Sequence, residues 1–112
     1  MQWHYCWRCG ENMPMLDEAE YRVVSELYGA AFKAIKAFRE EFGLPLGEIN
    51  LENRFKPVVD EYERMTGLRV TNANAIMHHR LAAFGPPCRD CGKPLRTPRA
   101  SRCMECGAAS PT

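Results

Sequence analysis

Six cysteines are arranged as three copies of the motif Cys-x-x-Cys-Gly, which begin at Cys6, Cys88 and Cys103. Each pair supplies two thiolates from one tight turn, and the glycine allows the backbone conformation that a turn around a metal ion needs. A structural zinc ion takes four ligands. Two pairs therefore complete one site, and the partners of the third pair have to be found elsewhere.

The two C-terminal pairs are separated by eleven residues, a spacing typical of zinc ribbons. The expected ligands of this first site are Cys88, Cys91, Cys103 and Cys106. Four thiolates leave no open position on the metal, so we expect a structural zinc ion, with rubredoxin-like iron as the alternative. A redox role is disfavoured because each pair leads into glycine instead of opening a helix.

The N-terminal pair, Cys6 and Cys9, needs other ligands if it is to hold a metal ion. Only three histidines are present, and His78 and His79 are two of them. A second zinc site formed by the pair with one or both of these histidines is our main hypothesis. Ligation by His4, sharing of the cysteines between two chains, and the absence of a second metal are the alternatives.

Motifs for catalysis are weak in this chain. Pro87-Cys88-x-x-Cys91 resembles half of the zinc deaminase signature, but His78-His79-Arg80 lacks the glutamate that the other half requires. No Ser–His–Asp set, phosphate loop or pair of carboxylates stands out. We expect a protein that is not an enzyme, with a catalytic zinc at the second site as the alternative.

Net charge is +1, but the charge is unevenly distributed. Residues 1–84 carry 10 Lys+Arg and 12 Asp+Glu, which gives −2, whereas residues 85–112 carry 5 and 2, which gives +3. A tetrathiolate zinc site contributes about −2, so the basic residues of this tail largely balance the metal. Arginines can bind phosphates, but the tail has no aromatic residue for stacking on bases. Nucleic-acid binding in transcription or RNA handling is therefore the alternative function.

The apolar pattern predicts a mainly α fold, a small helical bundle, with a metal-binding turn at the N-terminus and a zinc ribbon at the C-terminus. The expected domains are 1–12, 13–85 and 86–112. One helix should run from Asp17 to Phe42. Residues 47–66 carry a second helical pattern that Pro57 interrupts, so we expect a short helix and then a new one that starts near Lys56–Pro57 and ends at Gly67. A third should begin after Thr71 or Asn72 and end near Phe84. Residues 2–10 should form a short strand and a turn.

The N-terminus lacks the basic start and apolar run of a signal peptide, and no stretch approaches the ~20 apolar residues of a membrane span. We therefore expect a cytoplasmic protein without a membrane partner, in a reducing environment where paired cysteines bind metals.

Several segments resemble a group of small, mostly uncharacterised bacterial zinc-ribbon proteins, so the resemblance covers most of the chain. They are Met13-Pro14-Met15-Leu16-Asp17-Glu18, the turn Met65-Thr66-Gly67, His78-His79-Arg80-Leu81, and Gly85-Pro86-Pro87-Cys88 with the following Cys91 to Ala100. The resemblance implies a bacterial origin, a helical body followed by a ribbon, and an immunity-type role beside a secreted toxin. It assigns no functional residue beyond the cysteines.

The leading functional hypothesis is non-catalytic binding of a protein partner, such as a bacterial toxin that the chain regulates or neutralises. An acidic helical face would suit a basic partner such as a nuclease. The carboxylates of this face are Glu18, Glu26, Glu40, Glu41, Glu48, Glu52, Asp60, Glu61 and Glu63.

Overall fold

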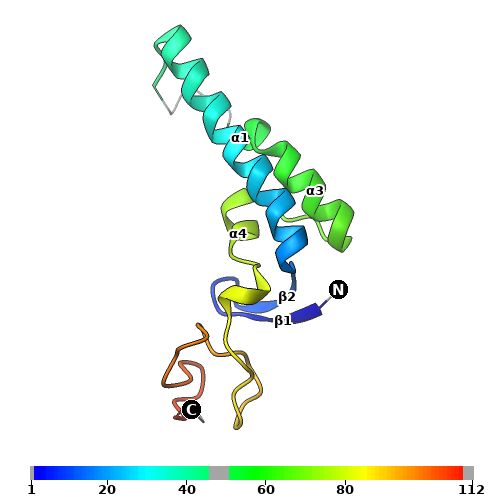
Figure 1. The fold of residues 1–112 in the computed structure, drawn as a ribbon, viewed down its shortest axis with the longest axis vertical. Coiled ribbons are helices and arrows are strands. Elements are labelled where there is room, and N and C mark those ends of the chain that lie inside the picture. The colour runs from blue at the N-terminus through cyan, green and yellow to red at the C-terminus, as the bar shows by residue number, and fades with distance from the viewer. Residues whose placement is uncertain (1, 46–50, 110–112) are drawn as a thin grey trace. The chain divides into compact units, whose positions relative to one another are not determined.

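A computed structural model describes residues 2–45 and 51–109 of the chain. The fold is mixed and mostly helical, with a small N-terminal β-hairpin (Figure 1). The C-terminal segment carries a cluster of four cysteines. The chain divides into two compact units. Unit 1 consists of Met1–Glu18 and His78–Thr112, and unit 2 of Ala19–Met77. Both cysteine-bearing segments expected from the sequence, 1–12 and 86–112, thus belong to unit 1.

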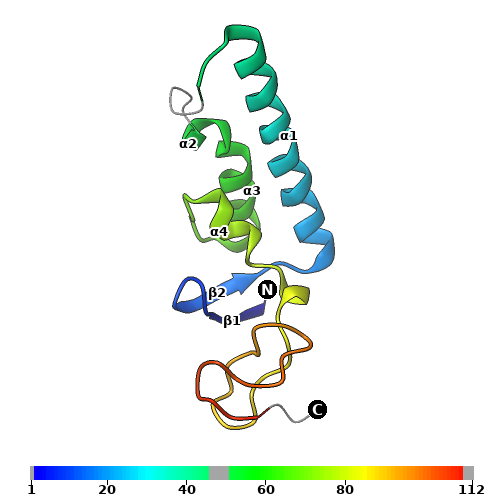
Figure 2. The same cartoon turned by 90° about the vertical axis from the view of Figure 1, so that its left-hand side faces the viewer.

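Unit 2 is helical. Helix α1 spans Glu18–Phe42, and α3, Lys56–Thr66, runs beside it (Figures 1 and 2). The apolar stripe of α1 buries Val24, Ala31 and Ile35, which confirms the helix expected from the spacing of its apolar residues.

The break at Pro57 is also confirmed. A short helix α2, Leu51–Arg54, precedes α3, and Pro57 lies in the first turn of α3, where its missing N–H leaves no hydrogen bond unmade. Gly67 ends α3 with φ 77°, and its N–H donates to the carbonyl of Glu63.

The third expected helix is much shorter than predicted. Helix α4 spans Ala73–Met77 and does not continue to Phe84. Its start is as expected, because the Oδ1 atom of Asn72 accepts a hydrogen bond from the backbone N–H of Asn74, at 3.0 Å. Beyond Met77 the chain changes conformation to pair with another segment, and only a short 3₁₀ helix, Leu81–Ala83, follows.

Leu16 is the residue with which that segment pairs. Its N–H donates to the carbonyl of His79 at 2.7 Å, and its carbonyl accepts from the N–H of Leu81 at 2.9 Å. A helical backbone at residues 79–81 would direct these groups along its own axis. The pairing with Leu16 therefore explains why the helical pattern ends early.

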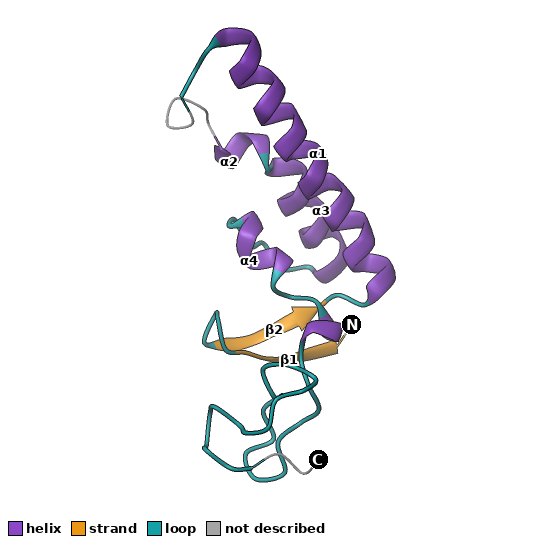
Figure 3. Cartoon of the chain, turned by 60° about the vertical axis from the view of Figure 1, so that its left-hand side comes forward, coloured by secondary structure: helices purple, strands orange, loops and turns teal. Residues whose placement is uncertain are grey.

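Unit 1 begins with an antiparallel hairpin of β1, Gln2–Cys6, and β2, Glu11–Met15 (Figure 3). The strand expected within residues 2–10 corresponds to β1, whereas β2 was not predicted. Residues 13–16 are buried, so this strand supplies much of the apolar interior of unit 1. In the part of the chain that the structure describes, no helix has the length and apolar character needed to span a bilayer.

Candidate metal centres

All three cysteine pairs adopt the same local turn. In each, the N–H of the glycine donates to the carbonyl of the first cysteine: Gly10 to Cys6 at 2.8 Å, Gly92 to Cys88 at 2.9 Å, and Gly107 to Cys103 at 2.8 Å. The three glycines have φ values of 74°, 78° and 82°, a region that other residues rarely adopt. The motif thus fixes a turn that directs two sulfur atoms to one side.

The four C-terminal cysteines form one cluster. The Sγ atoms of Cys88 and Cys106 are 3.6 Å apart, as are those of Cys91 and Cys103, and all four lie within 4.8 Å of one another. Sulfur atoms bound tetrahedrally to zinc at about 2.3 Å would be about 3.8 Å apart. The cluster could therefore hold a metal ion and is consistent with a zinc-ribbon-like site.

Little hydrocarbon surrounds this cluster. Leu95, which is 2% exposed, packs with Cys88 and Cys103, and among the described residues only Ala100 and Ala108 extend the group. Hydrogen bonds from the backbone amides of Cys91 and Asp90 lower the pKa of Cys88 to about 7. These amides favour the thiolate form that a metal ion requires.

A second group combines Cys6 and Cys9 with His79, and these ligand atoms also lie within 4.8 Å of one another. The Nε2 atom of His79 is 3.2 Å from the Sγ atom of Cys9, and His79 is fully buried. Backbone hydrogen bonds to Leu16, the residue after β2, join the segment of His79 to the hairpin. The group could hold a metal ion with three protein ligands.

The pKa values of His79 and Cys9 in this group are shifted in opposite directions. Burial, followed by the charges of His78 and His4, lowers the pKa of His79 to about 4, so its imidazole is neutral and able to bind a metal near pH 7. Burial and the neighbouring thiol of Cys6 raise the pKa of Cys9 to about 11. A metal ion must therefore displace a proton from Cys9.

The other two histidines are not in this group. His78 was expected as a possible fourth ligand, and it is half-buried but absent from the set of ligand atoms that converge. His4, on β1, stacks edge-on against Phe84 with ring centroids 4.9 Å apart. Its Nε2 atom is the only buried side-chain nitrogen or oxygen without a hydrogen-bond partner among the described residues.

The helix expected to begin after Thr71 or Asn72 and to end near Phe84 would have contained both histidines. That assignment was wrong for His79, because the helix ends at Met77 and His79 is 0% exposed. The signal that would have identified His79 is its pairing with Leu16, and a single sequence does not reveal pairing between distant segments.

Aromatic residues of the hairpin contact cations of the C-terminal segment. The Nζ atom of Lys93 lies 4.1 Å from the ring centroid of Tyr5, and the guanidinium carbon of Arg96 lies 4.2 Å from the ring of Trp7. Arg8 covers the same tryptophan at 4.4 Å. Each such contact contributes about 0.5–1 kcal/mol at an exposed site. The sequence had suggested that these cations mainly balance the metal charge, and stacking on the hairpin was missed.

Comparisons of the chain with protein-family models, with curated proteins and with solved structures find no match. The resemblance to zinc-ribbon proteins is supported only as far as the four-cysteine cluster.

Proposed function

We propose that this chain is a non-catalytic zinc-binding protein that uses its metal-stabilised N-terminal hairpin to bind a protein partner. The observation that carries the proposal is the exposure of Trp3. Its side chain is 51% exposed on β1, only three residues before Cys6, which belongs to the second ligand group.

Zinc suits both ligand groups. Thiolate and imidazole are its preferred protein ligands, and the four-cysteine cluster supplies a complete tetrahedral shell. A shell of this kind excludes substrate, which supports a structural role. The small apolar cluster around Leu95 would otherwise have to hold this segment alone.

An exposed tryptophan on a rigid hairpin has the properties of an interface anchor. Tryptophan is enriched among the residues that contribute most to binding between proteins. A hairpin held by a metal ion at Cys6 and Cys9 loses little further freedom on binding, which favours affinity. An immunity protein that neutralises a bacterial toxin would be one form of this role.

The acidic helical face is less suited to the contact than the sequence suggested. Five of its carboxylates lie in ion pairs within the chain: Glu18 with Arg80, Glu26 with Arg22, Asp60 with Lys56 and Arg69, Glu61 with Arg64, and Glu63 with Arg69. Glu48 lies outside the described residues. A partner that bound these carboxylates would have to compete with the internal cations.

Affinity purification tests the proposal. Tagged protein is purified after crosslinking from the cells that express it naturally, beside the variants Trp3→Ala and Val23→Ala. Val23 is the matched control because it is also an exposed apolar residue, 41% accessible, but lies on α1. We expect one protein to be recovered in near-equal amount, and Trp3→Ala to reduce its affinity at least about tenfold. An equal loss of affinity for the partner in both variants, or no partner bound at micromolar concentrations, would contradict the proposal.

Nucleic-acid binding is the second candidate, and one observation favours it. The C-terminal segment lacks aromatic residues, but Tyr5 and Trp7 of the hairpin lie against Lys93 and Arg96 in the same unit. Such interleaving of aromatic and cationic side chains is typical of single-strand binding surfaces. Binding to RNA or single-stranded DNA that weakens steeply with salt would support this candidate over a protein partner.

A further inference from the structure

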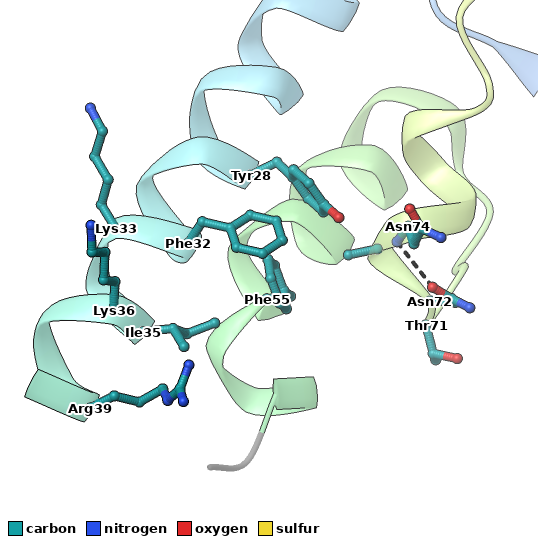
Figure 4. Close-up of a pocket in the computed structure, with 11 residues that line it drawn as sticks. Tyr28, Phe32, Lys33, Ile35, Lys36, Arg39, Phe55, Thr71, Asn72 and Asn74 are labelled. Atoms are coloured by element: carbon teal, nitrogen blue, oxygen red, sulfur yellow. Dashed lines mark hydrogen bonds between the residues drawn. The ribbon is translucent and has the colours of Figure 1, made fainter. Parts of the chain in front are cut away.

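Unit 2 contains a pocket of about 690 Å³ that neither metal centre uses. It lies between α1, the residue Phe55 that links α2 to α3, and residues 71–74 at the start of α4 (Figure 4). Pockets that bind small organic molecules have volumes of about 300–1,000 Å³ and mostly apolar walls. The size alone therefore fits a single ring-bearing ligand.

Three aromatic rings form one wall of the pocket. Tyr28 and Phe55 are stacked with centroids 5.2 Å apart, and Phe32 meets their edges at 4.9 and 5.3 Å. Phe32 is nevertheless 51% exposed, so much of its apolar surface faces the open pocket (Figure 4). A flat apolar group placed against these rings would remove that surface from water and gain ring-to-ring contact.

Three cations of α1 line the same pocket at intervals of three residues: Lys33, Lys36 and Arg39 (Figure 4). Among the described residues, none of them lies within ion-pair distance of a carboxylate. Glu40 lines a neighbouring cavity with Lys36 and Arg39 but is not paired with either.

Other cations of the helices behave differently. Arg22 pairs with Glu26, and Lys56 pairs with Asp60 at 3.0 Å. Arg54 of α2 also lacks an ion pair with a described carboxylate, but its guanidinium carbon lies 4.4 Å from the ring centroid of Phe38. Arg39 donates from Nε to the carbonyl of Leu44 at 3.2 Å, which leaves its charge without a carboxylate partner among the described residues. Lys33, Lys36 and Arg39 therefore give the pocket a positive rim beside an apolar floor. This combination is complementary to a ligand with a ring and a negative charge.

We propose that the pocket binds a small organic anion, a ring-bearing carboxylate whose apolar body packs on Phe32 and Phe55 and whose carboxylate faces Lys36. The opposite side of the pocket carries Thr71 and Asn74, which offer polar groups for orienting the ligand. The Oδ1 atom of Asn72 is already engaged by the backbone of α4 (Figure 4). This ligand site is independent of the partner surface proposed around Trp3.

Two probes of equal shape test the charge requirement. Calorimetry and amide chemical shifts are measured with 2-naphthoate and with the neutral 2-naphthamide. We expect 2-naphthoate to shift the backbone amide signals of residues 28–39 and 71–74. It should bind at least tenfold more tightly than 2-naphthamide. Equal affinities, or no binding of either probe at millimolar concentration, would overturn the proposal. Concentration-dependent shifts of the same amides without any probe would show that a second copy fills the pocket, and would also overturn it.

Three variants separate the pocket from the rest of the protein. Lys36→Gln should weaken the binding of 2-naphthoate about threefold to tenfold and leave the affinity for 2-naphthamide unchanged. Phe32→Ala should weaken both probes, and its exposed position lets the fold persist, which circular dichroism would verify. Lys56→Gln is the matched control because it removes a cation of α3 that does not line the pocket. An equal effect of Lys36→Gln and Lys56→Gln would contradict the proposed contact.

Discussion

The Nε2 atom of His79 lies 3.2 Å from the Sγ atom of Cys9, although the two residues are 70 positions apart in the sequence. Backbone hydrogen bonds between Leu16 and residues 79–81 join the segment of His79 to the hairpin that carries Cys9. A metal ion bound here would join the two segments of unit 1 and close a long chain loop. Cross-links across long loops gain the most from the lost freedom of the unfolded chain.

His79→Ala should reduce the metal content of the protein from two ions per chain to one, whereas His78→Ala should leave it at two. The difference follows from the geometry, since His79 belongs to the ligand group with Cys6 and Cys9 and His78 does not. Native mass spectrometry of both variants gives the count directly. Loss of one ion in the His78 variant alone would show that the ligand assignment is wrong.

Cys103→Ala should release the metal of the four-cysteine cluster and loosen residues 88–107 while most of the helical circular dichroism is retained. The physical reason is that α3, α4 and nearly all of α1 belong to unit 2, and this cysteine belongs to unit 1. Hydrogen exchange would locate the loosened segment. A total loss of helical signal would mean that the helices depend on the cluster.

Local signals explain the part of the fold that the sequence predicted. The period of the apolar residues gives α1, and Pro57 and Gly67 mark the ends of α3 through their own backbone preferences. The spacing of the C-terminal cysteines likewise brings four sulfur atoms together with turns that are fixed by their glycines. Each of these features depends on residues that are close in sequence.

Pairing between distant segments explains what was missed. The second strand of the hairpin contains Pro14, which cannot donate a hydrogen bond and disfavours a strand assignment. The early end of α4 and the burial of His79 both follow from hydrogen bonds to Leu16. Which of the two adjacent histidines joins Cys6 and Cys9 thus depends on the tertiary pairing with Leu16. The helical pattern of these residues did not indicate that pairing.

Zinc affinity of the second ligand group should rise with pH between about pH 6 and 8. Burial and Cys6 raise the pKa of Cys9 to about 11, so metal binding releases its proton and strengthens about tenfold per pH unit for each proton displaced. His79, with its pKa lowered to about 4 by burial, is already neutral and adds no dependence in this range. Chelator competition on the Cys103→Ala variant isolates this site. An affinity that does not change with pH would contradict this protonation state of Cys9.

Two glycines should respond in opposite directions to substitution by alanine. A Cβ atom at Gly85 would lie 2.4 Å from the carbonyl oxygen of Thr97 and 2.9 Å from Cβ of Leu95, so Gly85→Ala should force the backbone apart and destabilise unit 1. Gly29 lies inside α1, where an added Cβ would meet no atom within 4 Å apart from its chain neighbours and the backbone of its own helical turns. Gly29→Ala should therefore stabilise unit 2 by about 1 kcal/mol through helix propensity alone.

Thermal and urea unfolding, followed by helical circular dichroism and by tryptophan fluorescence, separates these two effects. Both tryptophans lie in the hairpin of unit 1, whereas the helical signal comes almost entirely from unit 2. Gly29→Ala should raise the midpoint of the helical signal, and Gly85→Ala should lower the midpoint seen by fluorescence. A stabilising effect of Gly85→Ala would mean that residues 85 and 97 are not in the close contact described here, because no relaxation of a side chain can relieve a clash with backbone oxygen.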